Sequence, residues 1–138
     1  MTPCLLDAGP MVALFDRGDR FHAHFRSAIE QPDQPLQMYT TWPCVTEASH
    51  LLGPRYRIAL LQWVAGGAVQ VYPFDVSDLQ DMCEFITQYT QQPRTEMDLA
   101  DASLYWLARD SGLTRIMTMD VRDFSRYRLP DGRAFEIL

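Results

Sequence analysis

The sequence predicts an α/β fold, a three-layer α/β/α sandwich with a mostly parallel central sheet. Short apolar runs at 4–6, 36–42, 68–74 and 116–119 alternate with segments whose apolar residues recur at helical spacing. These runs lack polar alternation, which is typical of parallel strands covered by helices on both faces. The chain contains no repeat or linker, and its length suits one core, so we expect a single domain over residues 1–138.

Helix-breaking residues set the limits of the expected elements. Pro10 suits the first position of a helix, and Gly53-Pro54 ends one helix before the next begins. Gly112 ends the last of the longer helices. We therefore expect helices at 10–15, 21–29, 43–52, 58–65, 75–89 and 98–110, and a short final strand at 135–138.

The composition argues against a membrane protein and against a disulfide-bonded one. The chain has no apolar run long enough to span a membrane, and its first residues lack the basic segment of a signal peptide. The cysteines Cys4, Cys44 and Cys83 are isolated and odd in number, so we expect small buried thiols in a reducing compartment. These features together predict a cytoplasmic protein.

The net charge of −6 is unusual for a protein that binds nucleic acid, because such proteins are generally basic. All 12 basic residues are arginines, however, and arginine binds phosphate through paired hydrogen bonds. Residues 109–138 contain six arginines and five acids, whereas residues 1–108 contain six arginines and thirteen acids. The C-terminal segment is therefore slightly basic, although ordinary solvated surface charge explains any single arginine equally well.

Two aspartates, Asp7 and Asp120, each stand where an expected strand ends. Sites in open parallel sheets form outside the carboxyl ends of the strands, so both side chains enter one crevice if these strands are neighbours. Aspartate is also common in turns and at helix N-termini, and either residue alone fits that role better. Two aspartates at equivalent strand ends favour a site.

Glu47 lies within the expected helix 43–52. Cys44 and Leu51, three residues before it and four after it, are apolar, so we expect Glu47 to border the buried face. An unpaired carboxylate is costly there unless a cation or hydrogen bonds compensate for its charge. A favourable interaction with the helix dipole is an equally good explanation.

Two pairs of acids are spaced three residues apart. Asp98 and Asp101 share a helix face, and Thr95 followed by Asp98 resembles a capping box. We therefore assign Asp98 to a cap and Asp101 to a ligand set. Asp123 follows Asp120 by three residues and is either a secondary ligand or, with slight preference, another cap.

Clustered carboxylates repel one another and need a positive partner. Oxygen ligands suit Mg²⁺ or Mn²⁺ better than zinc, and two such ions can stabilise the attacking and leaving oxygens of a phosphodiester. The chain has no lysine and no glycine-rich phosphate loop, which excludes a Walker-type nucleotide site.

Four segments, in order along the chain, resemble the PIN-domain nucleases, most closely the VapC-type toxins of toxin–antitoxin pairs. They are LLDAGP at 5–10, TEA at 46–48, DLADAS at 98–103, and TMD at 118–120 followed by DF at 123–124. No single segment is specific, but four in the correct order in a chain of this length are. The family often has Ser or Thr after the first acid, where this chain has Ala8 and Gly9; this removes a polar contact but no acid.

The resemblance implies a PIN-like sandwich whose four principal acids bind one or two Mg²⁺ or Mn²⁺ ions. These acids are Asp7, Glu47, Asp101 and Asp120. Thr118 would support the site, and Asp98 and Asp123 are secondary residues.

The resemblance also implies an endoribonuclease that cleaves RNA, acts as the toxin of a type II toxin–antitoxin system, forms a homodimer and is blocked by a VapB-type antitoxin. We expect the ions to stabilise charge on the scissile phosphate while one acid orients or deprotonates the attacking water. Arg122, Arg126 and Arg128 are the candidates for contact with the RNA backbone.

Two other functions fit parts of the sequence. A catalytically weak PIN module that binds RNA or a protein partner needs no full ligand set, and the four acids argue against it. A phosphatase of the haloacid dehalogenase type also uses an Asp at a strand end, but it expects a second acid two residues after Asp7, where Gly9 stands.

Overall fold

The structure, a computed structural model, describes residues 1–91 and 95–138 and contains a five-stranded, all-parallel sheet. Its strands are β1 (Thr2–Leu6), β2 (Leu36–Thr40), β3 (Gln70–Val71), β4 (Arg115–Met117) and β5 (Glu136–Ile137). Their order across the sheet is β3-β2-β1-β4-β5, with β1 at the centre. The expected parallel α/β fold is therefore confirmed.

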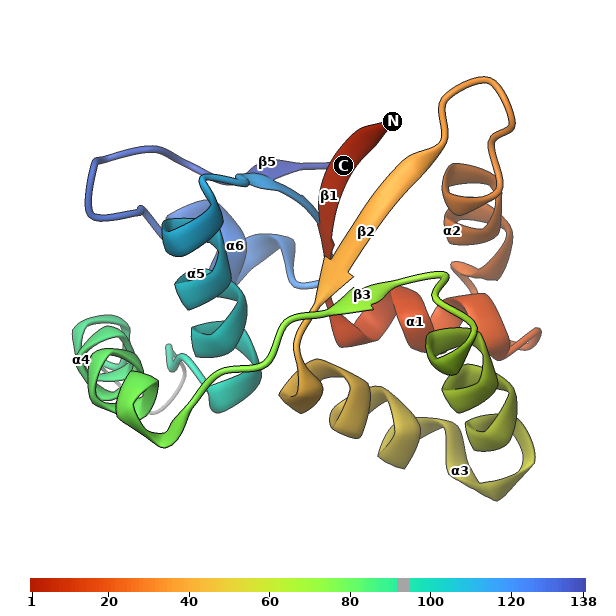
Figure 1. Ribbon diagram of the computed structural model, residues 1–138, viewed down its shortest axis with the longest axis horizontal. Coiled ribbons are helices and arrows are strands. Elements are labelled where there is room, and N and C mark those ends of the chain that lie inside the picture. The colour runs from red at the N-terminus through yellow and green to blue at the C-terminus, as the bar shows by residue number, and fades with distance from the viewer. Residues whose placement is uncertain (92–94) are drawn as a thin grey trace.

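Helices connect successive strands and cover both faces of this sheet. They are α1 (Ala8–Phe15), α2 (His22–Ile29), α3 (Trp42–Ala65), α4 (Leu79–Tyr89, after the 3-10 turn η1 at Val76–Asp78), α5 (Leu99–Ser111) and α6 (Val121–Arg126). Helices α1, α2 and α3 lie on one side of the sheet, and α4, α5 and α6 lie on the other (Figure 1). Parallel crossovers are right-handed, so helices change face where the direction of strand addition reverses.

That reversal occurs between the central strand β1 and its neighbour β4. The chain first adds β2 and β3 on one side of β1 and later adds β4 and β5 on the other. Leu6 is in register with Met117, and the Asp7 amide donates to the Met117 carbonyl oxygen at 3.0 Å. The carboxyl ends of β1 and β4 are thus side by side, at the position where open α/β sheets form their sites.

Glycine accounts for two helix limits that the sequence predicts. Gly53 has φ 69° and ψ −178°, so it breaks α3 into the two expected helical segments, and Pro54 opens the second. Gly112 follows α5 in the left-handed conformation, with φ 80°.

Other limits differ from the expectation. Asp7 caps α1, so this helix begins at Ala8 and Pro10 occupies its third position rather than its first. Trp42 begins α3 instead of ending β2, because Pro43 suits the first turn of a helix. The strand expected at 68–74 shortens to β3, which pairs with β2 only through its two residues.

Helix α6 is not among the expected elements. It has six residues, too few to show apolar periodicity, and its one buried residue is Phe124. The Asp120 side chain starts this helix by accepting a hydrogen bond from the Asp123 amide.

Helix α5 is the most deeply buried helix segment. Every residue from Ala100 to Ala108 is buried, because α5 contacts both α3 and α4 and its apolar side chains belong to the hydrophobic core. Of the cysteines, Cys4 and Cys44 are buried as expected, but Cys83 is exposed on α4; all three are free. Among residues 1–91 and 95–138, no helix combines the length and apolar character needed to cross a membrane.

Candidate active site

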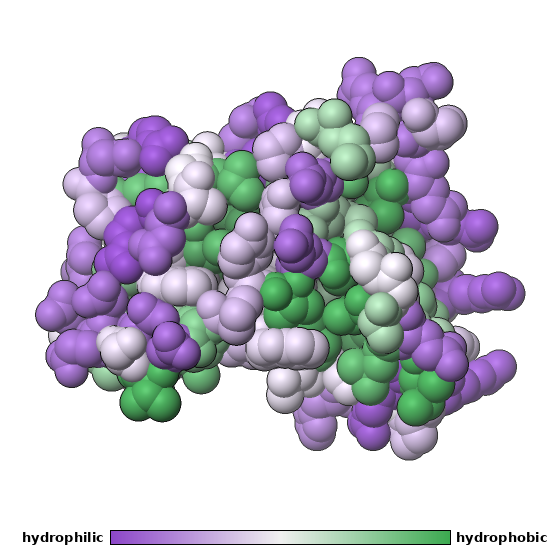
Figure 2. Space-filling view, viewed as in Figure 1, coloured by the Kyte–Doolittle hydropathy of each residue, from purple (hydrophilic) through white to green (hydrophobic). Residues whose placement is uncertain are grey.

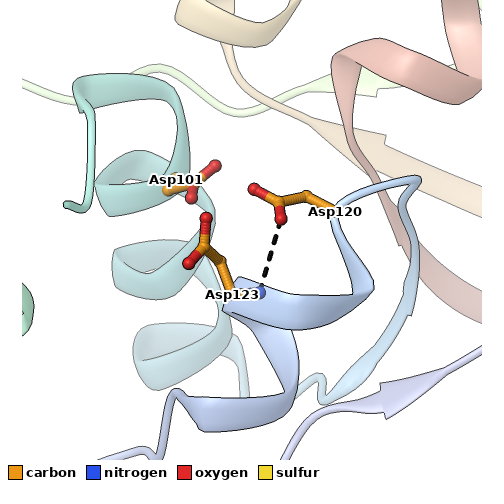
Figure 3. A group of neighbouring side chains, drawn as sticks. All are labelled: Asp101, Asp120 and Asp123. Carbon is orange, nitrogen blue, oxygen red and sulfur yellow. Dashed lines mark hydrogen bonds between the residues drawn. The ribbon is translucent and has the colours of Figure 1, made fainter. Parts of the chain in front are cut away.

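Three aspartates from two helices converge in the crevice beyond the sheet. One carboxylate oxygen from each of Asp101, Asp120 and Asp123 lies within 4.8 Å of the other two. Figure 3 shows Asp101 on α5 facing Asp120 and Asp123, which both come from the start of α6. The Asp123 amide donates to Asp120 Oδ1 at 3.3 Å, which fixes the Asp120 side chain across the first turn of α6.

Asp7 joins this group through Thr118. The Asp7 side chain is 8% exposed, and its Oδ1 accepts a hydrogen bond from the Ala8 amide at 2.8 Å. Its Oδ2 accepts a hydrogen bond from Thr118 Oγ1 at 2.7 Å, while Thr118 Oγ1 accepts one from the Asp120 amide at 2.9 Å. A single buried hydroxyl therefore links the carboxylate after β1 to the backbone that leads into α6.

Asp101 is also held by a hydroxyl group. It is 8% exposed, and its Oδ2 accepts a hydrogen bond from the Tyr127 hydroxyl at 2.7 Å. Asp98 is the N-cap of α5 and accepts a hydrogen bond from the Asp101 amide at 2.8 Å. The prediction that Asp98 is a cap is confirmed. The capping box expected from Thr95 is wrong, because α5 begins only at Leu99.

Asp123 is not a cap. It lies in the first turn of α6 with its carboxylate toward Asp101 and Asp120, and Asp120 is the N-cap instead (Figure 3). Asp123 Oδ1 accepts a hydrogen bond from Arg126 Nε at 3.1 Å. The expected role as a cap is therefore wrong, and the role of Asp123 as a secondary ligand stays a prediction.

Glu47 is exposed rather than set against the buried face. Cys44 and Ala48 are buried, but Leu51, the apolar residue that indicated a buried face, is 62% exposed. The pKa of Glu47 is raised by partial desolvation and then by the negative charges of neighbouring aspartates. These neighbours are Asp98, Asp7 and Asp120. Glu47 therefore lies at the edge of the acidic group, close enough for the negative charges of the aspartates to act on it.

Burial and mutual repulsion raise the pKa values of Asp7, Asp101 and Asp120. Burial first, and then the charges of Asp7 and Asp98, raise the pKa of Asp101 to about 8. Burial, followed by the hydrogen bond and charge of Asp123, raises the pKa of Asp120 to about 6. Burial likewise raises the pKa of Asp7. A site with this much unbalanced negative charge favours a bound cation.

The three candidate RNA-contacting arginines differ in their surroundings. Arg122 is exposed on α6, next to the acids. Arg126 is half-buried; Nη1 donates to the Tyr89 carbonyl oxygen at 3.1 Å, and Nε binds Asp123. The Arg128 guanidinium donates to the carbonyl oxygens of Ser125 and Tyr127. Arg126 therefore fastens α6 to α4, and Arg122 has the more open guanidinium.

The sequence alone did not single out Tyr127. It lies 26 residues from Asp101 in the chain, so no local spacing connects the two. Cys44 also lies under the site, with Sγ 4.0 Å from Asp7 Oδ1 and 3.8 Å from the Ala100 carbonyl oxygen. The sequence predicted burial of that thiol but not its place beside Asp7.

Comparison with known proteins gives one relative in sequence and related solved structures. No protein-family model matches the chain. The ribonuclease VapC26 of Mycobacterium tuberculosis is 25% identical over 138 residues, which cover 97% of this chain and 98% of that protein. This similarity confirms the resemblance to VapC-type PIN-domain proteins.

Two solved structures share the fold. The crystal structure of Mycobacterium tuberculosis VapC20, a sarcin-ricin loop cleaving toxin, superposes with a TM-score of 0.68 at 19% identity and covers 86% of this chain and 90% of VapC20. The crystal structure of VapBC2 from Rickettsia felis, bound to a DNA fragment from their promoter, superposes with a TM-score of 0.64 at 11% identity. That match covers 99% of this chain and 98% of the other.

Proposed function

We propose that this chain, which resembles VapC26 over nearly its whole length, is a metal-dependent endoribonuclease that hydrolyses RNA phosphodiester bonds as the toxin of a toxin–antitoxin pair. The observation that supports this most directly is the convergence of Asp101, Asp120 and Asp123 beside Asp7, at the carboxyl ends of the neighbouring strands β1 and β4. The chain would act as one domain over residues 1–138, in the cytoplasm.

The donor set fits a hard divalent cation. Every candidate ligand is a carboxylate oxygen, which suits Mg²⁺ or Mn²⁺. Asp7, Asp101 and Asp120 would hold one or two ions, with Asp123 beside them. A divalent cation supplies Lewis-acid stabilisation of the negative charge that develops on the phosphodiester.

The chain's own residues would prepare the site for this chemistry. Thr118 holds Asp7, and the first turn of α6 holds Asp120, so these carboxylates need little rearrangement when substrate arrives. Glu47 is the most exposed of the four principal acids, which suits a side chain that helps to orient the attacking water. Arg122 would bind a phosphate of the RNA backbone.

A protein partner accounts for apolar surface on α3. Leu51, Ile58 and Leu61 of this helix are exposed, and Figure 2 shows apolar side chains gathered over the region where α3 and β3 lie, with hydrophilic ones around the rim. Contiguous apolar surface of this kind is typical of protein interfaces. Because VapBC2 was crystallised as a pair with promoter DNA, we propose a VapB-type antitoxin as the partner and a homodimer as the state of the toxin.

A nuclease assay with the purified chain tests the proposed function. The substrates are a single-stranded RNA and, because VapC20 cleaves the sarcin-ricin loop, an RNA that contains this loop. We expect cleavage with Mn²⁺ or Mg²⁺, none with EDTA, and a loss of at least about 100-fold in the Asp7→Asn variant because an electrostatic element of the site is removed.

Asp33→Asn is the matched control. Asp33 precedes β2 and therefore lies at the amino ends of the strands, away from the site, so its substitution should leave cleavage unchanged. Full metal-dependent activity in Asp7→Asn would contradict the proposed function, and so would cleavage that is insensitive to EDTA.

A further inference from the structure

Tyr127 donates a buried hydrogen bond to one of the clustered acids. Its side chain is fully buried, and its hydroxyl lies 2.7 Å from Asp101 Oδ2. A carboxylate group has about four lone-pair positions, so this hydrogen bond fixes the orientation of the group and leaves it able to bind a cation. We infer that Tyr127 is a positioning residue that holds the Asp101 carboxylate in place for the divalent cation; this inference rests on the proposed function.

The Tyr127 ring is itself fixed by its neighbours. It contacts Phe124 with ring centroids 5.1 Å apart and Tyr89 with centroids 4.9 Å apart, both edge to face. The guanidinium of Arg126 lies 5.0 Å from the ring centroid, and the Tyr127 amide donates to the Asp123 carbonyl oxygen at 3.2 Å. The hydroxyl therefore has a defined place and cannot follow a displaced carboxylate.

Helix α6 acts on the acidic group from both of its ends. Asp120 is its N-cap, Asp123 lies in its first turn, and Tyr127 is its C-cap residue. Through Tyr127 the same short helix also holds Asp101, which belongs to α5. The hydrogen bond thus joins the two helices that supply the three converging carboxylates. Without it, repulsion from Asp7 and Asp98 would be free to turn Asp101 away.

The position of Tyr127 in the chain shows why a phenol suits this task. A shorter hydroxyl at this position, at the far end of α6, would not reach Asp101, whereas the rigid ring spans the gap within the aromatic cluster. A hydrogen bond from a neutral hydroxyl also adds no competing positive charge to the site. Hydrogen bonds to ligands of this kind contribute about 10- to 100-fold to metal affinity or activity in metalloenzymes.

The test measures Mn²⁺ affinity by isothermal titration calorimetry in wild type and in Tyr127→Phe, with the unfolding temperature of each metal-free protein. Tyr105→Phe is the matched control: Tyr105 is buried in the same cluster, 6.4 Å from the Tyr127 ring, but its hydroxyl donates to the Arg128 carbonyl oxygen instead of an acid. We expect Tyr127→Phe to bind Mn²⁺ roughly 10- to 100-fold more weakly, and Tyr105→Phe to bind it like wild type.

A double variant separates positioning from a general structural effect. In an Asp101→Asn background, adding Tyr127→Phe should leave Mn²⁺ affinity unchanged, because Tyr127 acts through Asp101. Equal Mn²⁺ affinity in wild type and Tyr127→Phe overturns the inference, as does an equal loss in Tyr105→Phe. Absence of Mn²⁺ binding in wild type overturns the proposed function itself and the inference with it.

A structure of the wild-type chain with Mn²⁺ tests the inference without any variant, should Tyr127→Phe fail to fold. Asp101 must then be a ligand while its carboxylate still accepts the Tyr127 hydrogen bond. A Mn²⁺ ion bound without Asp101, or an Asp101 ligand detached from Tyr127, overturns it.

Discussion

Helices α5 and α3 each bring one principal acid to the site, but they hold it very differently. Asp101 is buried on α5, in a stretch where every residue from Ala100 to Ala108 is buried, and it accepts a hydrogen bond from Tyr127. Glu47 is exposed on α3, which buries only one face in its first half and breaks at Gly53.

The difference indicates a division between a fixed acid and an adaptable one. Asp101 is oriented before any cation or substrate arrives, at the cost of a strongly raised pKa. Glu47 is exposed to solvent, and its pKa is raised first by partial desolvation and then by the charges of the neighbouring aspartates. Preorganised charges contribute most to binding and catalysis, so removing Asp101 should cost far more than removing Glu47.

The largest effect is expected for Asp101→Asn. The amide oxygen of asparagine can still accept the Tyr127 hydrogen bond, so the fold should persist while one negative charge of the candidate site is lost. We expect metal-dependent cleavage to fall by about 100- to 1,000-fold, with weaker Mn²⁺ binding, measured by single-turnover RNA cleavage and calorimetry.

Asp110→Asn on the same helix is the control for that substitution. Asp110 is exposed and paired with Arg109, so its loss should leave cleavage and Mn²⁺ affinity unchanged. If Asp101→Asn retained wild-type cleavage, the assignment of α5 as the helix with the essential fixed acid would be wrong.

The stability of the metal-free protein should also depend on pH in an unusual direction. The pKa of Asp101 rises in the folded state from 3.8 to about 8, and that of Asp120 from 3.8 to about 6. The folded protein therefore binds more protons than the unfolded chain over this range, so the free energy of unfolding falls as the pH rises from about 4 to about 8. Unfolding temperatures in EDTA at pH 5, 6, 7 and 8 measure this fall.

Two further measurements assign that pH dependence to the acids of the site. Asp101→Asn should flatten the decline between pH 6 and pH 8, because the group with the highest pKa no longer titrates. Adding Mn²⁺ at pH 8 should raise the unfolding temperature of wild type above its value in EDTA, because the cation binds only the folded state. A metal-free stability that rises from pH 5 to pH 8 would contradict both the burial and the repulsion argued for Asp101.

The elements that the sequence predicted correctly are those encoded by neighbouring residues. The apolar run before Asp7 forms the central strand, and Gly53-Pro54 breaks α3 as expected because glycine can adopt the positive φ found there. Helix α6 escaped prediction, since its formation depends on the Asp120 side chain and on packing of Phe124 rather than on a repeated pattern.

For the candidate site, the sequence indicated which acids lie close together but not how they are arranged. Asp7 and Asp120 follow neighbouring strands, so strand-end reasoning found them. The predicted burial beside Glu47 is wrong because Leu51, its apolar neighbour on the helix, is exposed, and exposed leucines are common on protein surfaces. The hydrogen bond from Thr118 to Asp7 spans 111 residues, and only the folded sheet brings such partners together.

The smallest effect, and the sharpest test of the comparison, is expected for Glu47→Gln. Because Glu47 is exposed and adaptable, we expect cleavage to fall by about tenfold or less and the free energy of unfolding to stay within about 0.5 kcal/mol of wild type. Glu84→Gln, which changes an exposed acid on α4, is the control and should behave like wild type in both measurements.

A loss in Glu47→Gln as large as that in Asp101→Asn would show that an exposed side chain can matter as much as a buried, hydrogen-bonded one here. In that case Glu47 would have to become ordered on binding the cation, and the Mn²⁺ affinity of the Glu47→Gln variant would fall in parallel with its cleavage activity. If cleavage falls while Mn²⁺ affinity is unchanged, Glu47 acts on the water or the substrate rather than on the cation, which is the role proposed for it.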